Sequence, residues 1–300
     1  MRIDQLRGVF AAMLTPLKSD FSPDLTAVQS FLEFLASRGC HGAVLLGTTG
    51  EGPSFSPAQR ISIIKAALEM RQEYPELRLL AGTGTPSLDE TIALTRAAFD
   101  LGIDAVLVLP PYYYRTAGEE GLFSWFRHVL QKAVPGDGFL LGYHIPPVTG
   151  VPLSIRLLER LTETFPDSFA GIKDSSGDPE FARQLGERFG DDLVVLTGND
   201  RLFSLALQSG ASGCITALAN LYSPILRRIW DSYQEGTLDE EAQQKISSQR
   251  DLLDRYPTAP ATLKALLAAR FGFPRWPVCP PLIPTPSHTL EEAFSEFDLS

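Results

Sequence analysis

The segment DLGIDAVLVL, residues 100–109, joins the end of a helical pattern to a short apolar run, and this joint decides the fold. Gly102 stands where a helix should end in the left-handed conformation, and the apolar run begins after a two-residue link. The same joint recurs in SRGCHGAVLL, residues 37–46, and in QSGASGCIT, residues 208–216. The repetition indicates helices alternating with strands, which is typical of a parallel sheet.

Eight short apolar runs lie in the first 220 residues or so. Each is too short for a buried helix and is apolar at consecutive positions, as strands of a buried parallel sheet are. They cover residues 9–14, 43–46, 78–81, 105–109, 139–143, 169–173, 193–196 and 213–216. We therefore expect eight strands.

Helical segments with recognisable starts lie between these runs. Ser56 and Asp178, each followed by a proline, are expected N-caps, and Ser87 with Glu90 predicts a capping box. The corresponding helices are expected at residues 57–72, 88–100 and 179–189.

Eight strands with seven or eight intervening helices are the number that closes a barrel. An open doubly wound sheet usually has five or six strands and a glycine-rich turn after the first, whereas TPLKSD follows the first strand here. The sequence therefore predicts an α/β fold, a (β/α)8 TIM barrel over residues 1–222 that carries the active site. Residues 223–300 contain helical patterns at 224–234, 238–254, 261–270 and 289–297 and are predicted to be a small C-terminal helical appendage.

Composition narrows the class of protein. The 300 residues are 44% hydrophobic, and the net charge is −10. A nucleic-acid-binding protein usually carries clustered positive charge, so this class is not expected. No leader-like or 18-residue apolar stretch occurs, so we expect a cytoplasmic protein without membrane contact. The three cysteines argue against a disulfide framework, and the four histidines lack metal-ligand spacing, so no metal site is expected.

Lys173 is the most informative polar residue at a predicted strand end. Active sites of such barrels lie at the carboxyl ends of the strands, and Lys173 ends the run FAGIK. A lone lysine there is more often one that extends its amine to solvent. Tyr143, however, ends the preceding strand and should be its lateral neighbour. A buried amine beside a phenol is what imine chemistry needs, because the phenol can relay protons.

The motif GTTGE, residues 47–51, is the second candidate element. Two hydroxyls beside a glycine at a strand end can offer O–H and backbone N–H donors to a carboxylate. An ordinary turn between a strand and a helix explains the same letters equally well, so the motif alone does not decide.

Five motifs together resemble the dihydrodipicolinate synthase / N-acetylneuraminate lyase family. They are GTTGEG (47–52), PPYYY (110–114), YHIPPVTG (143–150), GIKDSSGD (171–178) and GCITALAN (213–220), and they occur in the family's order. The resemblance implies a Schiff-base lyase that acts on pyruvate or another 2-keto acid, with the imine itself as electron sink and no cofactor. It also implies a homotetramer built from two tight dimers.

The resemblance also assigns roles to residues. It implies that Lys173 forms the Schiff base and that Tyr143 donates and accepts protons. Tyr113 would reach into a neighbouring subunit's site and join Thr49 and Tyr143 in a proton relay. The residues implied to contact the keto acid are Thr48, Thr49 and Gly50, which hold its carboxylate, and Ile215, through its backbone.

One departure from the family pattern concerns the substrate. Val148 stands where dihydrodipicolinate synthases have an arginine for the carboxylate of aspartate semialdehyde, and valine cannot pair with a carboxylate. Aldol cleavage or condensation is therefore the first hypothesis. The alternatives are a 2-keto-3-deoxy sugar acid dehydratase and the synthase itself, with another cation such as Arg115. A non-catalytic keto-acid-binding barrel is a fourth, although binding alone needs neither Lys173 nor Tyr143.

Overall fold

The computed structural model describes residues 3–256, 258–286, 291 and 295–297, and its strands form a closed barrel. Neighbouring strands follow chain order from β1 to β8, and their pairing is parallel. The predicted (β/α)8 barrel is confirmed, and each predicted strand lies within two residues of an observed one. The strands are β1 (Gly8–Ala12), β2 (Gly42–Leu45), β3 (Arg78–Gly82), β4 (Ala105–Val108), β5 (Phe139–His144), β6 (Phe169–Asp174), β7 (Val194–Thr197) and β8 (Gly213–Thr216).

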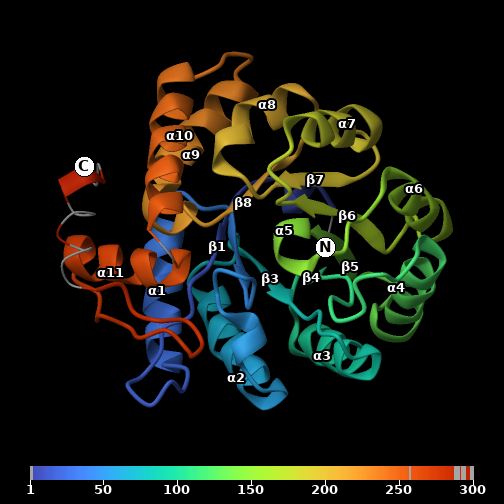
Figure 1. Cartoon of the computed structure of the whole chain (residues 1–300), viewed down its shortest axis with the longest axis horizontal. Helices are drawn as coiled ribbons and strands as arrows, with labels where there is room; N and C mark the ends of the chain where they lie inside the picture. Colours follow the sequence, from blue (N-terminus) through green and yellow to red (C-terminus); the bar gives the residue numbers. More distant parts are fainter. Residues whose placement is uncertain (1–2, 257, 287–290, 292–294, 298–300) are drawn as a thin grey trace. The chain divides into compact units, whose positions relative to one another are not determined.

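Helices separate the strands and continue after the last one (Figure 1). They are α1 (Leu25–Ser37), α2 (Pro57–Leu68), α3 (Leu88–Leu101), α4 (Glu119–Ala133), α5 (Pro146–Thr149), α6 (Ile155–Thr164), α7 (Pro179–Phe189), α8 (Phe203–Gln208), α9 (Ala219–Gln234), α10 (Glu240–Arg255) and α11 (Ala259–Phe271). The helix predicted over 57–72 is α2 followed by a 3-10 turn, Glu69–Gln72, which tightens its end. The helix predicted at 289–297 lies mostly outside the described residues.

The chain divides by its internal contacts into two units. One comprises Arg78–Ile215 with the first eight residues, and the other comprises Val9–Leu77 with the residues from Thr216 onward. The boundary predicted at residue 222 falls inside α9, where Tyr222 has non-helical dihedral angles. The division into residues 1–222 and 223–300 stays a prediction.

In the first unit, apolar stripes attach the helices to the sheet. Helix α4 buries Leu122, Phe126, Val129 and Leu130, a spacing that places them on one face. The neighbouring α3 and α6 both pack against α4. Gly102 ends α3 with a φ of 98°, the left-handed conformation expected at this joint. The joint that decides the fold is therefore built as the sequence predicts.

One capping motif differs from its prediction. The Ser87 side chain accepts a hydrogen bond from the Glu90 N–H, but the Ser87 N–H donates to Thr85 Oγ1 and not to the Glu90 side chain. Only half of the predicted capping box forms, because the nearby threonine hydroxyl satisfies that donor first. The reciprocal box forms at the start of α2, between Ser56 and Gln59.

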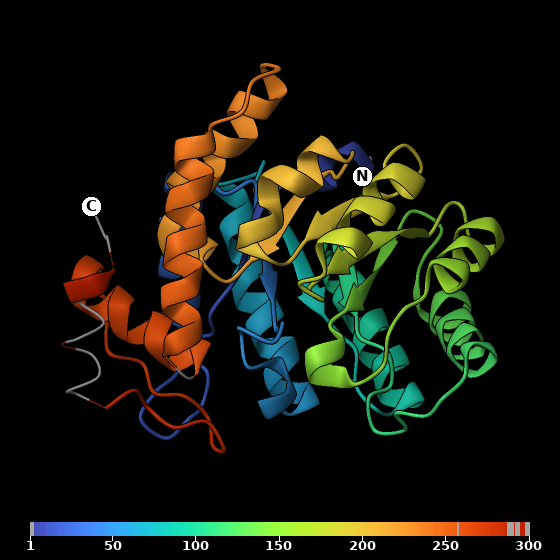
Figure 2. The ribbon, with the colours of Figure 1, turned by 45° about the horizontal axis from the view of Figure 1, so that its top comes forward.

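The second unit carries the C-terminal helices. Helix α10 packs on both α9 and α11 (Figure 2, orange and red). Cys40 and Cys279 of this unit and Cys214 of the other are buried free thiols. Among the described residues, no helix combines the length and the apolar character needed to cross a membrane.

Asn220 at the start of α9 is buried and ties this helix to the segment around β1. Its amide donates to Ala12 O at 2.8 Å, and its Oδ1 accepts from the Leu14 N–H at 3.1 Å. Asn220→Ala leaves both backbone groups buried without these partners, so we expect the free energy of unfolding to fall by about 2–4 kcal/mol. Urea denaturation measures the change, with the exposed Ser248→Ala in α10 as a control that should shift it by under about 0.5 kcal/mol.

Candidate active site at the ends of strands β5 and β6

Lys173 and Tyr143 lie side by side on adjacent strands. The β5–β6 register pairs them directly, and alternation along each strand turns both side chains to the same face. Lys173 Nζ is 3.2 Å from the Tyr143 hydroxyl and 4.3 Å from the centroid of its ring. The two residues are only 3% and 4% exposed. A primary amine and a phenol thus share a nearly dry environment.

Gly198, just after β7, provides the space for the lysine. A Cβ on this residue would lie 3.0 Å from Lys173 Cε and would overlap the Ser175 hydroxyl. Its N–H also donates to Asp174 O at 2.6 Å, which brings this backbone close to the end of β6. Gly198 is not among the site residues predicted from the sequence. A single glycine after a strand carries too little signal to reveal which side chain crosses it.

The next residues on the two strands, His144 and Asp174, also pair in register but point to the opposite face. His144 Nδ1 accepts from the Leu153 N–H at 2.9 Å, and its ring stacks on Phe181 of α7 at 4.7 Å. Its Nε2 lies 4.0 Å from Asp174 Oδ1. The sequence assigned His144 no role, and the structure shows that it attaches the segment after α5 to β5.

Burial acts on both members of this pair. It lowers the pKa of His144 to about 4, because the charged imidazolium loses solvation. It raises the pKa of Asp174, and the Ser176 N–H, which donates to its Oδ1, opposes that rise. Among the described residues, Asp174 Oδ2 has no hydrogen-bond partner.

The GTTGE motif follows β2 in the second unit. Thr48 is exposed, Thr49 is half-buried and Gly50 is buried. Thr15 Oγ1 donates to Gly50 O at 2.6 Å, and a Cβ on Gly50 would lie only 2.6 Å from Met13 O. The turn is therefore pressed against the chain that leaves β1, and only glycine fits there.

The segment after β4 carries exposed aromatic residues. Tyr113 is 76% exposed, and its ring meets that of Tyr114 edge-on at 5.3 Å. Arg115 lies over Gly150, where a Cβ would be 2.9 Å from its Cδ. Gly150 ends the short helix α5, which carries Val148, itself 56% exposed. Arg115 therefore lies beside the helix that carries Val148.

The predicted site residues thus fall into separate groups. Lys173 and Tyr143 lie in direct contact, and Ile215 is buried in β8 of the same unit. Thr48, Thr49 and Gly50 belong to the second unit, and their grouping with Lys173 stays a prediction.

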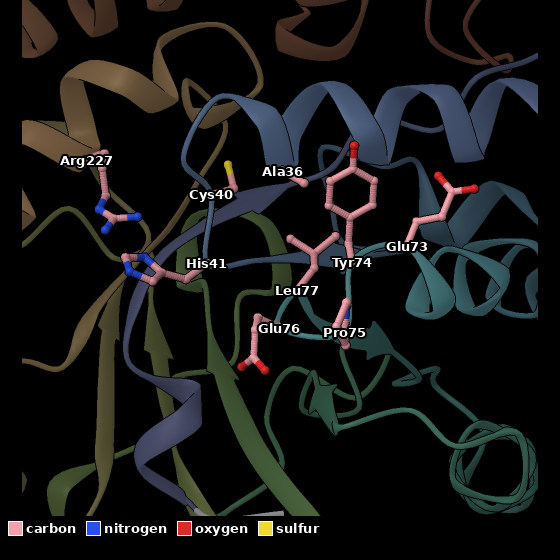
Figure 3. Close-up of a pocket in the computed structure, with 9 residues that line it drawn as sticks. All are labelled: Ala36, Cys40, His41, Glu73, Tyr74, Pro75, Glu76, Leu77 and Arg227. Carbon is pink, nitrogen blue, oxygen red and sulfur yellow. The ribbon is translucent and has the colours of Figure 1, made fainter.

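A separate pocket of about 380 Å³ lies in the second unit (Figure 3). Cys40 and His41 line it and precede β2, whereas Thr48 follows that strand, so the pocket is at the other end of β2. His41 Nδ1 accepts from the Val9 N–H at 2.9 Å, and burial lowers the pKa of His41 to about 4. Arg227 donates to Gly39 O and pairs with Asp231 at 2.8 Å. These contacts fix the connection between α1 and β2.

Comparisons with known proteins agree with one another. Residues 5–295 match the Dihydrodipicolinate synthetase family. An uncharacterized DapA-like lyase of Chloroflexus aurantiacus is 43% identical over 279 residues, 93% of this chain and 91% of that protein. The crystal structure of dihydrodipicolinate synthase from Agrobacterium tumefaciens superposes with a TM-score of 0.88 at 28% identity, covering 97% and 98% of the two chains. A prophage protein of the same family from Escherichia coli, crystallised with pyruvate, has a TM-score of 0.88 at 22% identity, covering 96% of each chain.

The His144–Asp174 pair predicts how stability depends on pH. Between pH about 6.5 and about 4, the unfolded chain binds a proton at His144 that the folded chain does not, so stability falls as the pH falls. Asp174, whose pKa is raised on folding, acts in the opposite direction. His144→Asn keeps an acceptor for the Leu153 N–H but removes this titration.

We expect a shallower loss of stability for His144→Asn than for the natural chain from pH 6.5 to 4.5. Urea denaturation at several pH values measures this slope, and His41 contributes equally to both proteins. An unchanged slope would mean that folding does not lower the pKa of His144.

Proposed function

The chain belongs to the dihydrodipicolinate synthetase family and is a lyase, and we propose that it forms an imine between Lys173 and pyruvate or a related 2-keto acid. The imine withdraws electrons from the adjacent carbon, which permits aldol cleavage or condensation there. The buried contact between the Lys173 amine and the Tyr143 hydroxyl, at 3.2 Å, is the observation that carries this proposal.

Tyr143 supplies the proton transfers in the proposed reaction. Addition of the amine to a ketone gives a carbinolamine, and its loss of water needs an acid near the departing hydroxyl. The phenol lies within hydrogen-bonding reach of the lysine nitrogen, next to the carbon on which that hydroxyl would form. It can then accept and return a proton on the bound carbon chain.

Thr48, Thr49 and Gly50 are proposed to hold the substrate carboxylate, with the backbone of Ile215 as a further contact. Support comes from the parallel barrel, because GTTGE follows β2 and Lys173 lies near the carboxyl end of β6. In barrel enzymes the segments after the strands build one common site. The hydroxyls and N–H groups of this turn would then face the keto acid.

Tyr113 is proposed to act across a subunit interface. A tyrosine that is 76% exposed gains by being covered by a second copy of the chain, where its hydroxyl can join Thr49 and Tyr143 in a relay. This arrangement requires an oligomer, which we propose to be a homotetramer. We further propose that the enzyme is cytoplasmic and uses no metal or organic cofactor.

Substrate choice depends on Val148. Its apolar side chain favours an aldolase of 2-keto acids, or the related dehydratase, over a synthase that must bind a second carboxylate. Arg115 favours the synthase as a second candidate, because its side chain lies over Gly150 next to the helix of Val148. Within the described residues, Arg115 has no ion-pair partner, so its charge is available.

The first test concerns the covalent site. Pyruvate followed by borohydride should add one reduced keto-acid mass to the peptide that contains Lys173, as measured by mass spectrometry. Tyr143→Phe retains the amine but lacks the proton donor, so its kcat should fall by about 10²–10⁴.

Lys173→Ala is the control, because it removes the reacting amine together with its aliphatic stem and should give no adduct at this peptide. An adduct on another lysine, or none at saturating pyruvate, would contradict the imine proposal.

The second test concerns the aldehyde partner. With valine at 148, condensation of pyruvate with aspartate semialdehyde should be slow, and Val148→Arg should accelerate it by restoring a carboxylate contact. A panel of 4-hydroxy-2-keto acids, assayed for cleavage and for dehydration, separates the aldolase from the dehydratase.

Arg115→Ala is the matched variant. The synthase would be established instead if the natural chain had a kcat/KM of about 10⁴–10⁸ M⁻¹s⁻¹ for aspartate semialdehyde and Arg115→Ala lost this activity.

A further inference from the structure

Glu51 ends the GTTGE motif, but its side chain is fully buried and is bound by α11 and by the segment that follows this helix. Its Oε1 lies 2.6 Å from Nζ of Lys264 in α11, and both side chains are 0% exposed. Its Oε2 accepts from the Cys279 N–H at 2.7 Å. Lys264 Nζ also donates to Pro277 O at 2.7 Å. Both oxygens of the carboxylate are thus bound by residues more than 200 positions away in the chain.

The backbone of this turn is strained. Leu46 and Glu51, on either side of the proposed carboxylate-binding residues, have φ values of 61° and 56° although neither is glycine. Residues other than glycine rarely adopt this left-handed backbone conformation, and it persists only where the surroundings enforce it. The Glu51 N–H donates to Thr48 O at 3.1 Å, so the conformation of Glu51 is coupled directly to the threonine.

Burial and ion pairing act in opposite directions on the charge of Lys264. Burial lowers the pKa of Lys264, and the adjacent Glu51 carboxylate opposes this by favouring the ammonium. Neither charge can be left alone in this environment, since a buried charge without its partner is expensive. The turn is therefore held where the Glu51 carboxylate and the Lys264 ammonium are in contact.

We propose that Lys264, with the Cys279 backbone, is a positioning residue that holds Thr48, Thr49 and Gly50 in the geometry that binds the substrate carboxylate. This inference rests on the proposed function. The C-terminal helical region, expected from sequence to be a mere appendage, thereby sets the affinity of the barrel for keto acids. Lys264 acts through Glu51 and does not touch the substrate.

The test separates binding from chemistry with the borohydride-trapped adduct on Lys173. Lys264→Met keeps an unbranched side chain one atom shorter than lysine but removes the charge, so the turn should relax. We expect the half-saturating pyruvate concentration to rise at least about tenfold, because a well-placed charge-assisted contact is worth about that factor or more. The adduct at saturating pyruvate should stay near the natural level, because Lys173 and Tyr143 are unchanged.

Arg255→Met is the matched control. Arg255 lies in the same C-terminal region and also pairs with a carboxylate, that of Glu296 at 3.0 Å, but this pair is exposed. Its loss should leave half-saturation unchanged. Glu51→Gln should give a smaller rise, and combining it with Lys264→Met should be less than multiplicative, because both remove one interaction.

Two results would overturn the proposal. One is a folded Lys264→Met protein with natural half-saturation, which would make the pair purely structural. If that variant does not fold, unchanged half-saturation in Glu51→Gln would do the same. Absence of any adduct in the natural chain would instead refute the proposed function, so the two failures are distinguishable.

Discussion

The register between β5 and β6 is the constraint on which the candidate site depends. It pairs Tyr143 with Lys173 on one face and His144 with Asp174 on the other. Because side chains alternate along a strand, a slip of one residue in either strand would exchange the two faces. The amine would then meet the aromatic ring of Phe181 in α7, which now stacks on His144, and the phenol would lose the lysine. The register does shift by one residue between Leu140 and Leu141, where β6 advances from Phe169 to Gly171, and this irregularity precedes the pairing of Tyr143 with Lys173.

Two buried lysines illustrate how a partner determines chemistry. Lys264 is held by a carboxylate and a carbonyl oxygen, which favour its charged form, and loss of one member of such a pair typically costs about 3–5 kcal/mol. Lys173 lies beside a phenol, and among the described residues no carboxylate lies within 4.0 Å of its amine. The same residue type therefore supports structure in one place and is suited to reaction in the other.

Glycines decide where the chain can approach these groups. Gly198 leaves room for the lysine stem, and Gly50 brings its turn against Met13 O. Neither position can accept a Cβ without movement of its neighbours. In each unit, the polar groups are thus placed by the close approach of the backbone as well as by their own hydrogen bonds.

Sequence alone determined the barrel, because period, strand length and the glycine-ended joints at Gly39, Gly102 and Gly210 are local properties that act within about ten residues. It also singled out Lys173 and Tyr143, since both end apolar runs. The role of His144, the space left by Gly198 and the partner of Glu51 were decided only by the tertiary structure. Glu51 and Lys264 are 213 residues apart, and nothing in either local pattern indicates the other. Contacts of that separation depend on how whole elements pack, and a local pattern carries no information about them.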